Sequence, residues 1–255
     1  PVCLGSGTKL CDMLTDWDKE YIAVLRLGVV TDTQDLSGSI LSQCDADSLA
    51  SVTEEQVRDV IMGFVGDYDQ IPPMYSALKV DGKKLYELAR AGKEVERKPR
   101  RVQIKEIEII KIELPLVQMR VVCSKGTYIR TLCHDIGSRL GCGGAMESLE
   151  RSRVGIFGME EALTLSELER LRDEGKISDV IIAPDAVFAA YKSVCVNEQG
   201  LKMVRNGNRL GAAQLRQNMQ NLGVTDREQV RVYDEEERFY GVYAYHEAER
   251  LLKPV

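Results

Sequence analysis

One eight-residue segment constrains the fold of this chain more than any other. It runs from Cys123 to Arg130 (CSKGTYIR), follows a run of apolar residues, and precedes apolar residues at helical spacing. The pattern predicts a strand that ends near Cys123 and a helix over 127–140 that Gly141 ends. Free backbone N–H groups at such a junction favour anions. We therefore expect a phosphate or carboxylate near Tyr128 and Arg130; the alternative is a buried tyrosine beside a solvated arginine.

The composition is that of a globular protein. The chain has 255 residues, of which 44% are hydrophobic and 29% charged, and this suits one large domain or two unequal ones. No apolar run approaches the ~20 residues of a membrane helix, and no secretory signal is visible. Seven scattered cysteines without a C-x-x-C pair, and two histidines, predict no metal site. We expect a reduced, cytoplasmic protein that does not engage a membrane.

Positive charge is concentrated in one part of an otherwise acidic chain. The formal net charge is −6, but the segment 79–105 contains ten lysines and arginines against four acids. Such asymmetry is typical of a nucleic-acid contact face. A solvated helix and loop is the alternative reading of the same charges.

Periodicity and turn residues predict an α+β chain with two domains. Strands are expected over 19–30, 102–114, 116–123 and 146–154, and helices over 8–16, 53–61, 83–91, 127–140 and 164–175. An alanine-rich linker ends at Ala190. The remaining 191–255 contain a short strand (194–196), a helix (201–205) and a hairpin that pairs 230–233 with 239–245. We therefore predict domains over 1–190 and 191–255.

Four segments, in content and order, resemble the TruB family, the bacterial tRNA pseudouridine-55 synthases. They are 19–33, 71–90 (IPPMYSALKVDGKKLYELAR), 123–130 and 149–155 (LERSRVG). The resemblance runs from Pro1 to about Phe157, and the tail after Tyr191 resembles the family's PUA-like RNA-binding module. It implies a catalytic domain with a mixed, mostly antiparallel sheet over 1–190 and a small β-rich domain over 191–255. It also implies that the basic residues 71–105 form an insertion that clamps tRNA.

The resemblance implies isomerisation of uridine to pseudouridine at position 55 in the T-loop of tRNA. The glycosidic bond breaks, the uracil turns, and C5 rejoins the ribose, without a cofactor. Because the target base is stacked within the loop, the enzyme must flip it into a pocket. The implied partner is the T-stem–loop of tRNA, not DNA. The resemblance does not indicate an oligomeric state, and we expect a monomer by default.

Four residues match the family's motifs at the site. The resemblance implies that Tyr21 stacks on the flipped base and that Leu149 forms an apolar wall. Tyr128 presses the sugar or base, or transfers a proton at C5. Arg130 pairs with the catalytic carboxylate and holds it ionised. The alternatives are a core aromatic for Tyr21, packing for Leu149 and a weak surface ion pair for Arg130.

Phosphate contacts are implied for a wider set of cations, which act as a patch because single lysines and arginines can replace one another. The set is Lys9, Lys79, Lys83, Lys84, Arg90, Lys125, Arg151 and Arg153.

The family's nucleophile is an aspartate in a segment of the form G-x-L-D-P-x-A-x-G, and these 255 residues contain no such segment. We expect it to lie immediately before Pro1 in the natural protein. Asp12, Asp16 and Asp18 do not stand in the motif, and Asp32 and Asp35 match the family's polar loop. The alternative is an inactive tRNA-binding protein or RNA chaperone of the same fold. It predicts tRNA affinity without isomerisation.

Overall fold

Two compact units make up the chain in the computed structural model, which describes residues 1–80, 82–217 and 221–255. One unit comprises residues 9–163 with 1–3, and the other 164–255 with 4–8. Each unit has a hydrophobic core of its own. Asp81, one of the acids of the basic segment, lies outside the described residues. The domain boundary at residue 190 stays a prediction.

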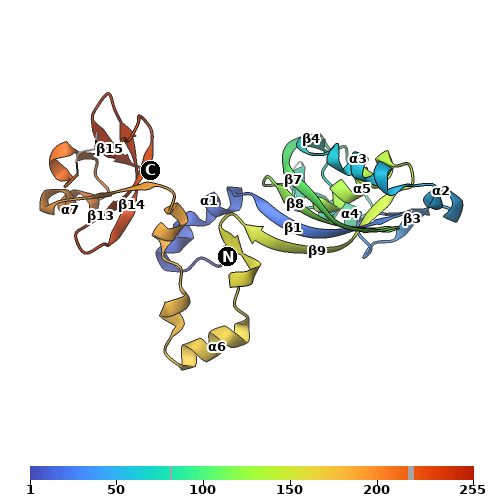
Figure 1. Ribbon diagram of the computed structural model, residues 1–255, viewed down its shortest axis with the longest axis horizontal. Helices are drawn as coiled ribbons and strands as arrows, with labels where there is room; N and C mark the ends of the chain where they lie inside the picture. The colour runs from blue at the N-terminus through green and yellow to red at the C-terminus, as the bar shows by residue number, and fades with distance from the viewer. Residues whose placement is uncertain (81, 218–220) are drawn as a thin grey trace. The chain divides into compact units, whose positions relative to one another are not determined.

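A six-stranded antiparallel sheet forms the first unit, in the order β10–β9–β1–β8–β7–β4 (Figure 1). Its strands are β1 (Lys19–Leu27), β4 (Gly66–Gln70), β7 (Arg100–Glu113), β8 (Leu116–Cys123), β9 (Gly144–Val154) and β10 (Phe157–Gly158). Every second residue of β8 from Val117 to Cys123 is buried. Because side chains alternate between the faces of a strand, this pattern turns one face of the sheet towards the core.

Two helices cover that face of the sheet (Figure 1). They are α3 (Glu54–Met62) and α5 (Ile129–Arg139), whose buried Ile61 and Leu132 share a core with Met119 of β8. The predicted capping box opens α3, with Thr53 and Gln56 bonding each other's backbone N–H groups. Shorter helices complete the unit: α1 (Cys11–Asp16), α2 (Ala46–Ala50) and α4 (Leu85–Arg90), with the 3-10 helix η2 (Met159–Glu161).

The structure corrects two of the predicted elements of this unit and adds a strand, β4, that was not predicted. The strand expected over 19–30 divides at Gly28, whose φ of +87° interrupts the extended backbone. β2 (Val29–Thr31) then pairs with β3 (Ile40–Gln43) in a small separate sheet. The helix expected over 83–91 is shorter, because Lys83–Lys84 form β6 against β5 (Lys79–Val80). Sequence periodicity missed β4, since its five residues are mostly polar (GDYDQ).

The second unit is built on a five-stranded sheet in the order β11–β13–β14–β15–β12. Its strands are β11 (Lys192–Cys195), β12 (Leu210–Gly211), β13 (Gln229–Tyr233), β14 (Phe239–His246) and β15 (Leu251–Pro254). β11 and β13 are parallel and the other pairs antiparallel, and the β13–β14 hairpin is confirmed. The helices are α6 (Leu165–Asp173) and α7 (Glu198–Val204), with the 3-10 helices η3 (Ile177–Val180), η4 (Pro184–Phe188) and η5 (Ala212–Gln214).

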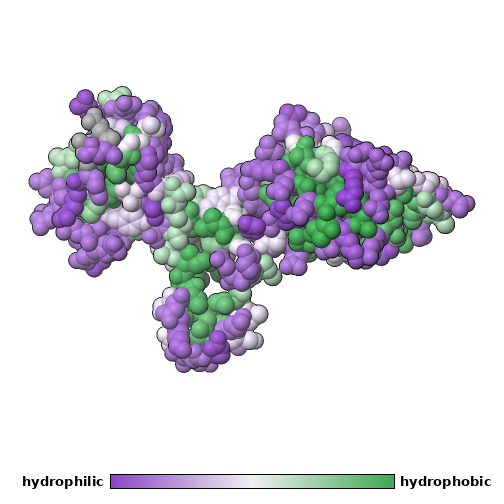
Figure 2. All heavy atoms as spheres, in the orientation of Figure 1, coloured by the Kyte–Doolittle hydropathy of each residue, from purple (hydrophilic) through white to green (hydrophobic). Residues whose placement is uncertain are grey.

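Two hydrophobic areas are visible on the surface of the protein. Figure 2 shows a hydrophobic area where Figure 1 draws β7, β8 and α4, and a second one along the segment that contains α6. In that segment Leu165 is 80% exposed, and Ile181 and Ile182 are more than half exposed. Among the described residues, no helix has both the length and the apolarity needed to cross a bilayer.

Candidate active site

The CSKGTYIR segment forms the strand-to-helix junction that its sequence predicted. The chain leaves β8 at Cys123, turns at Gly126 and enters α5 at Ile129. Gly126 has a φ of +80°, a conformation that residues with a Cβ rarely adopt. The Thr127 hydroxyl closes the turn by donating to the Ser124 carbonyl oxygen over 2.9 Å.

Tyr128 is the N-cap residue of α5, and the side chain of Gln70 holds its backbone. The Tyr128 N–H donates to Gln70 Oε1 over 2.8 Å, and Gln70 Nε2 donates to the Tyr128 carbonyl oxygen over 2.9 Å. Gln70 ends β4 and is only 1% exposed. Sequence analysis missed Gln70; its one signal is a polar residue directly before the Ile71-Pro72-Pro73 break.

Arg130, in the first turn of α5, binds two segments that are remote in sequence. Its Nη1 lies 3.3 Å from Asp35 Oδ2, and its Nη2 donates to the Tyr75 carbonyl oxygen over 2.7 Å. The side chains of Arg130 and Asp35 are 24% and 17% exposed. Arg130 is therefore not the solvated surface arginine of the alternative reading, and its carboxylate partner within the described residues is Asp35.

The loop that carries Asp35 is fixed to both α5 and β9. Gln34 accepts a hydrogen bond from the Thr131 hydroxyl over 2.7 Å, and residues 34–36 pair with Met146 at the edge of β9. Partial burial opposes ionisation of Asp35. Hydrogen bonds from Ser37 and Thr33 and the Arg130 charge outweigh it and hold the pKa of that carboxyl below its usual value. The loop thus presents Arg130 with an ionised partner.

Tyr21, Leu149 and Arg151 lie on the helix-covered face of the sheet. Tyr21 is opposite Arg151, and Ala23 is opposite Leu149, across the β1–β9 pair. Burial raises the pKa of the Tyr21 phenol, with the neighbouring Arg151 opposing, so the phenol stays neutral near pH 7. Leu149 is 42% exposed, which leaves an apolar side chain open on this face.

The other predicted RNA-binding cations occupy separate places in the first unit. Lys9 and Lys125 are exposed, and Lys125 pairs with Asp16 over 2.7 Å. Lys79, Lys83 and Lys84 belong to the β5–β6 hairpin. Lys84 and Arg90 each lie 5.4 Å from the centre of the Tyr86 ring. The hairpin and α4 therefore carry four of the predicted cations, and two of them, Lys84 and Arg90, lie against one aromatic ring.

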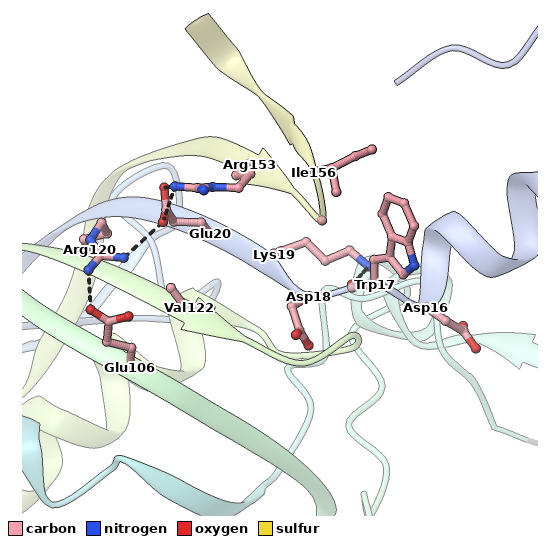
Figure 3. A pocket seen from close by; sticks show the side chains of 11 residues that line it. Asp16, Trp17, Asp18, Lys19, Glu20, Glu106, Arg120, Val122, Arg153 and Ile156 are labelled. Atoms are coloured by element: carbon pink, nitrogen blue, oxygen red, sulfur yellow. Dashed lines mark hydrogen bonds and ion pairs between the residues drawn. The ribbon is translucent and has the colours of Figure 1, made fainter. Parts of the chain in front are cut away.

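Arg153 lies on the opposite face of the sheet from Tyr21. It is opposite Glu20 and pairs with its carboxylate over 3.1 Å, in the wall of a pocket of about 670 Å³ (Figure 3). Glu20 also accepts from Arg120 over 3.0 Å and from the Ser152 hydroxyl over 2.8 Å. Burial opposes ionisation, but these donors together keep the pKa of Glu20 below its usual value. Glu20, Arg120 and Arg153 are bound to one another in this pocket, on the face of the sheet opposite Tyr21, so we do not place the reaction there.

Two other kinds of chemistry, a cysteine nucleophile and a bound metal ion, find no support among the described residues of the junction. Burial raises the pKa of the Cys123 thiol to about 11, so it stays protonated near pH 7. Over residues 1–80, 82–217 and 221–255, no three His, Cys, Asp or Glu side chains are grouped as metal ligands.

Two family models match the chain. The N-terminal domain model of TruB family pseudouridylate synthases covers residues 1–129, and the tRNA pseudouridylate synthase B C-terminal domain model covers 130–188. The chain belongs to the TruB family. The predicted family and the predicted α+β fold class are thereby confirmed.

Similar TruB proteins cover most of the chain. A protein named tRNA pseudouridine synthase B from Lachnoclostridium phytofermentans is 46% identical over 267 residues, which covers 100% of this chain and 84% of its own length. One of the same name from Clostridium tetani is 43% identical and covers 81% of this chain and 69% of its own.

Solved structures share the fold of this TruB chain at lower identity. An H/ACA RNP bound to a substrate RNA containing 2′-deoxyuridine matches with a TM-score of 0.66 and 19% identity, over 99% of this chain and 69% of that one. A Cbf5-Nop10-Gar1 complex matches with a TM-score of 0.64 and 24% identity, over 95% and 64%.

Proposed function

We propose that this protein isomerises uridine to pseudouridine in tRNA, at position 55 of the T-loop. The observation that carries the proposal is Arg130, anchored by Asp35 and the Tyr75 carbonyl at the start of α5. Membership of the TruB family supports the reaction class, and relatives named tRNA pseudouridine synthase B support tRNA as the substrate. The match of four segments to the pseudouridine-55 synthases supports the position.

The flipped uridine is held on the helix-covered face of the sheet. Tyr21 stacks on the base, and Leu149 supplies the apolar wall, because an unstacked base gains most from an aromatic face and a dry pocket. Arg130 uses two hydrogen bonds on Asp35 and Tyr75, and a guanidinium has five N–H donors. The remaining donors receive the carboxylate nucleophile and keep it ionised. We assign no nucleophile among these 255 residues.

The isomerisation breaks and forms bonds within the uridine alone, so it consumes no cofactor. The bond between C1′ and N1 of the uridine breaks, and C5 bonds to C1′. The proton on C5 then leaves, and N1 takes up a proton. Tyr128 follows Gly126 and Thr127 into α5, two residues before Arg130, and we propose that its phenol assists proton removal from C5.

The RNA is held by the cations around the β5–β6 hairpin together with Lys9, Lys125 and Arg151. We propose that residues 71–105 clamp the T-stem–loop through phosphate contacts and shape, and that 191–255 form a PUA-like RNA-binding domain. The protein acts as a monomer on tRNA and not on DNA. Arg153 is bound to Glu20 on the face of the sheet opposite Tyr21, and we propose that it stabilises the sheet rather than binds the substrate.

The second candidate function is tRNA binding or remodelling without isomerisation. The observation that favours it is the basic β5–β6 hairpin with α4, which would serve RNA binding alone as well as catalysis. Both functions require tight tRNA binding, so affinity alone does not separate them.

The test maps pseudouridine in an unmodified tRNA transcript after incubation with the protein expressed from its own gene. We expect pseudouridine at position 55 alone, and none in a transcript with cytidine at that position. Salt-sensitive tRNA binding without pseudouridine would replace the isomerase by the binding protein.

A further inference from the structure

We propose that Gln70 is a positioning residue that sets the orientation of the Tyr128 phenol for the reaction. Gln70 is the last residue of β4, and its side chain reaches a residue 58 positions away in sequence. We propose no contact between Gln70 and the substrate. The inference rests on the proposed isomerase function and deepens it.

The geometry of the contact carries the proposal. One planar amide both accepts from the N–H of Tyr128 and donates to its carbonyl oxygen, over 2.8 and 2.9 Å. These two backbone groups flank the Cα of Tyr128 on either side. Fixing both therefore fixes the direction in which the Cα–Cβ bond points. Gln70 thus does for Tyr128 what a strand partner does for a residue in a ladder.

Local structure makes this contact necessary. Tyr128 has φ −99° and ψ 107°, outside the helical region, and no side chain caps α5. Its N–H group precedes the helix and receives no helical carbonyl. Gln70 supplies the missing acceptor from a site that is 1% exposed, where water does not compete.

The segment that follows Gln70 contacts Arg130, the other candidate site residue of the junction. Pro72 accepts a hydrogen bond from Arg97 Nη1 over 3.2 Å, and the Tyr75 carbonyl accepts from Arg130. Residues 70–75 therefore contact the N-cap residue Tyr128 and Arg130 in the first turn of α5, two residues apart. Gln70 is the member of this segment that acts on Tyr128.

The test is a double-mutant cycle between Gln70→Ala and Tyr128→Phe, with pseudouridine formation in T-stem–loop RNA measured for the full protein. Because small misplacements of a reacting group are costly, we expect Gln70→Ala to lower kcat about tenfold or more and to leave KM within about twofold. Tyr128→Phe should then cost much less in the Gln70→Ala background than alone. Additive losses, or a raised KM with normal kcat, overturn the proposal.

Two further variants separate positioning from loss of stability. Val117→Ala opens the fully buried core of β8 and should lower the melting temperature without coupling to Tyr128→Phe. Gln70→Glu keeps the size and the acceptor but sets a carboxylate oxygen against the Tyr128 carbonyl, so it should fold and still lower kcat. A Gln70→Glu protein with wild-type kcat counts against the proposal.

Fluorine NMR of fluorotyrosine-labelled protein decides the inference if the wild-type protein does not isomerise uridine. The Tyr128 signal is assigned by its loss in Tyr128→Phe. A shifted or broadened Tyr128 signal in Gln70→Glu supports positioning even when the proposed function has failed. An unchanged signal rejects it.

Discussion

The role that we propose for Tyr128 predicts a loss of catalysis without a loss of RNA binding. It lies between a glycine-dependent turn and Arg130, and Gln70 holds its backbone. A phenol that assists proton removal contributes to the reaction rather than to RNA affinity. Tyr128→Phe should therefore lower kcat by about 10²–10⁴ while the Kd for tRNA stays within about twofold.

Single-turnover kinetics and filter binding measure these two effects. Tyr243→Phe is the matched control, since Tyr243 is 2% exposed in the core of the second unit. A Tyr128→Phe protein with weakened tRNA affinity and normal turnover assigns this tyrosine to RNA contact.

At this scale the sequence predicts residue types better than their partners. Tyr128 and Arg130 stand in a contiguous motif, so periodicity and turn chemistry placed them at a helix start. Asp35 and Gln70 reach them from 95 and 58 residues away. No local pattern encodes such pairings, and the polar β4 that carries Gln70 has no apolar alternation to reveal it.

Among the elements, β1 is held to its neighbours by a buried carboxylate. Glu20 is 9% exposed and binds Arg120 of β8 with Arg153 and Ser152 of β9. Glu20→Ala should lower the free energy of unfolding of this unit by about 2 kcal/mol at neutral pH, because the charge-assisted hydrogen bonds from Arg120, Ser152 and Arg153 to the carboxylate are lost. Urea unfolding measures this.

The exposed Lys111–Glu113 pair is the control, and Glu113→Ala should cost at most about 1 kcal/mol. Equal losses for both variants would mean that the Glu20 cluster contributes no more than a surface pair.

The same carboxylate predicts a pH dependence. The folded-state pKa of Glu20 is lowered, so its contribution is present above the unfolded pKa of about 4.3 and is lost as pH falls through the folded value. Glu20→Gln should flatten the stability profile in that acidic window and leave its shape above pH about 6 unchanged. A parallel profile for wild type and Glu20→Gln would contradict the assignment.

The RNA clamp that we propose depends on the β5–β6 hairpin. Reversing Lys83 and Lys84 to glutamate should weaken tRNA binding and lower the slope of log K against log salt by about 1.5 to 2. Arg58 and Lys111 are exposed cations outside 71–105, and their reversal makes the matched control. An unchanged salt slope for the hairpin variant refutes the clamp.

For the whole molecule, two separate cores predict that a core mutation in one unit destabilises that unit and not the other. Leu210 is fully buried in the core of the second unit. Leu210→Ala should destabilise that unit by about 2–5 kcal/mol. Hydrogen exchange should accelerate in β11 to β15 and stay unchanged in β1, β8 and β9. Acceleration throughout the chain would mean that the two units unfold together.

The sequence predicted a second domain because the strand pattern after Tyr191 restarts with short, separately punctuated elements, and its boundary at residue 190 stays a prediction. It did not predict how strands combine in each sheet. The parallel β11–β13 pair and the central place of β1 depend on contacts between segments far apart in the chain.

Release of tritium from C5 of uridine tests the central claim most directly. The substrate is a T-stem–loop RNA labelled at position 55, and the protein is the one its gene encodes. We predict multiple-turnover release that Tyr128→Phe suppresses, and none from RNA labelled at another uridine. Tight binding of the labelled RNA without tritium release would contradict the isomerase and leave a tRNA-binding protein of the same fold.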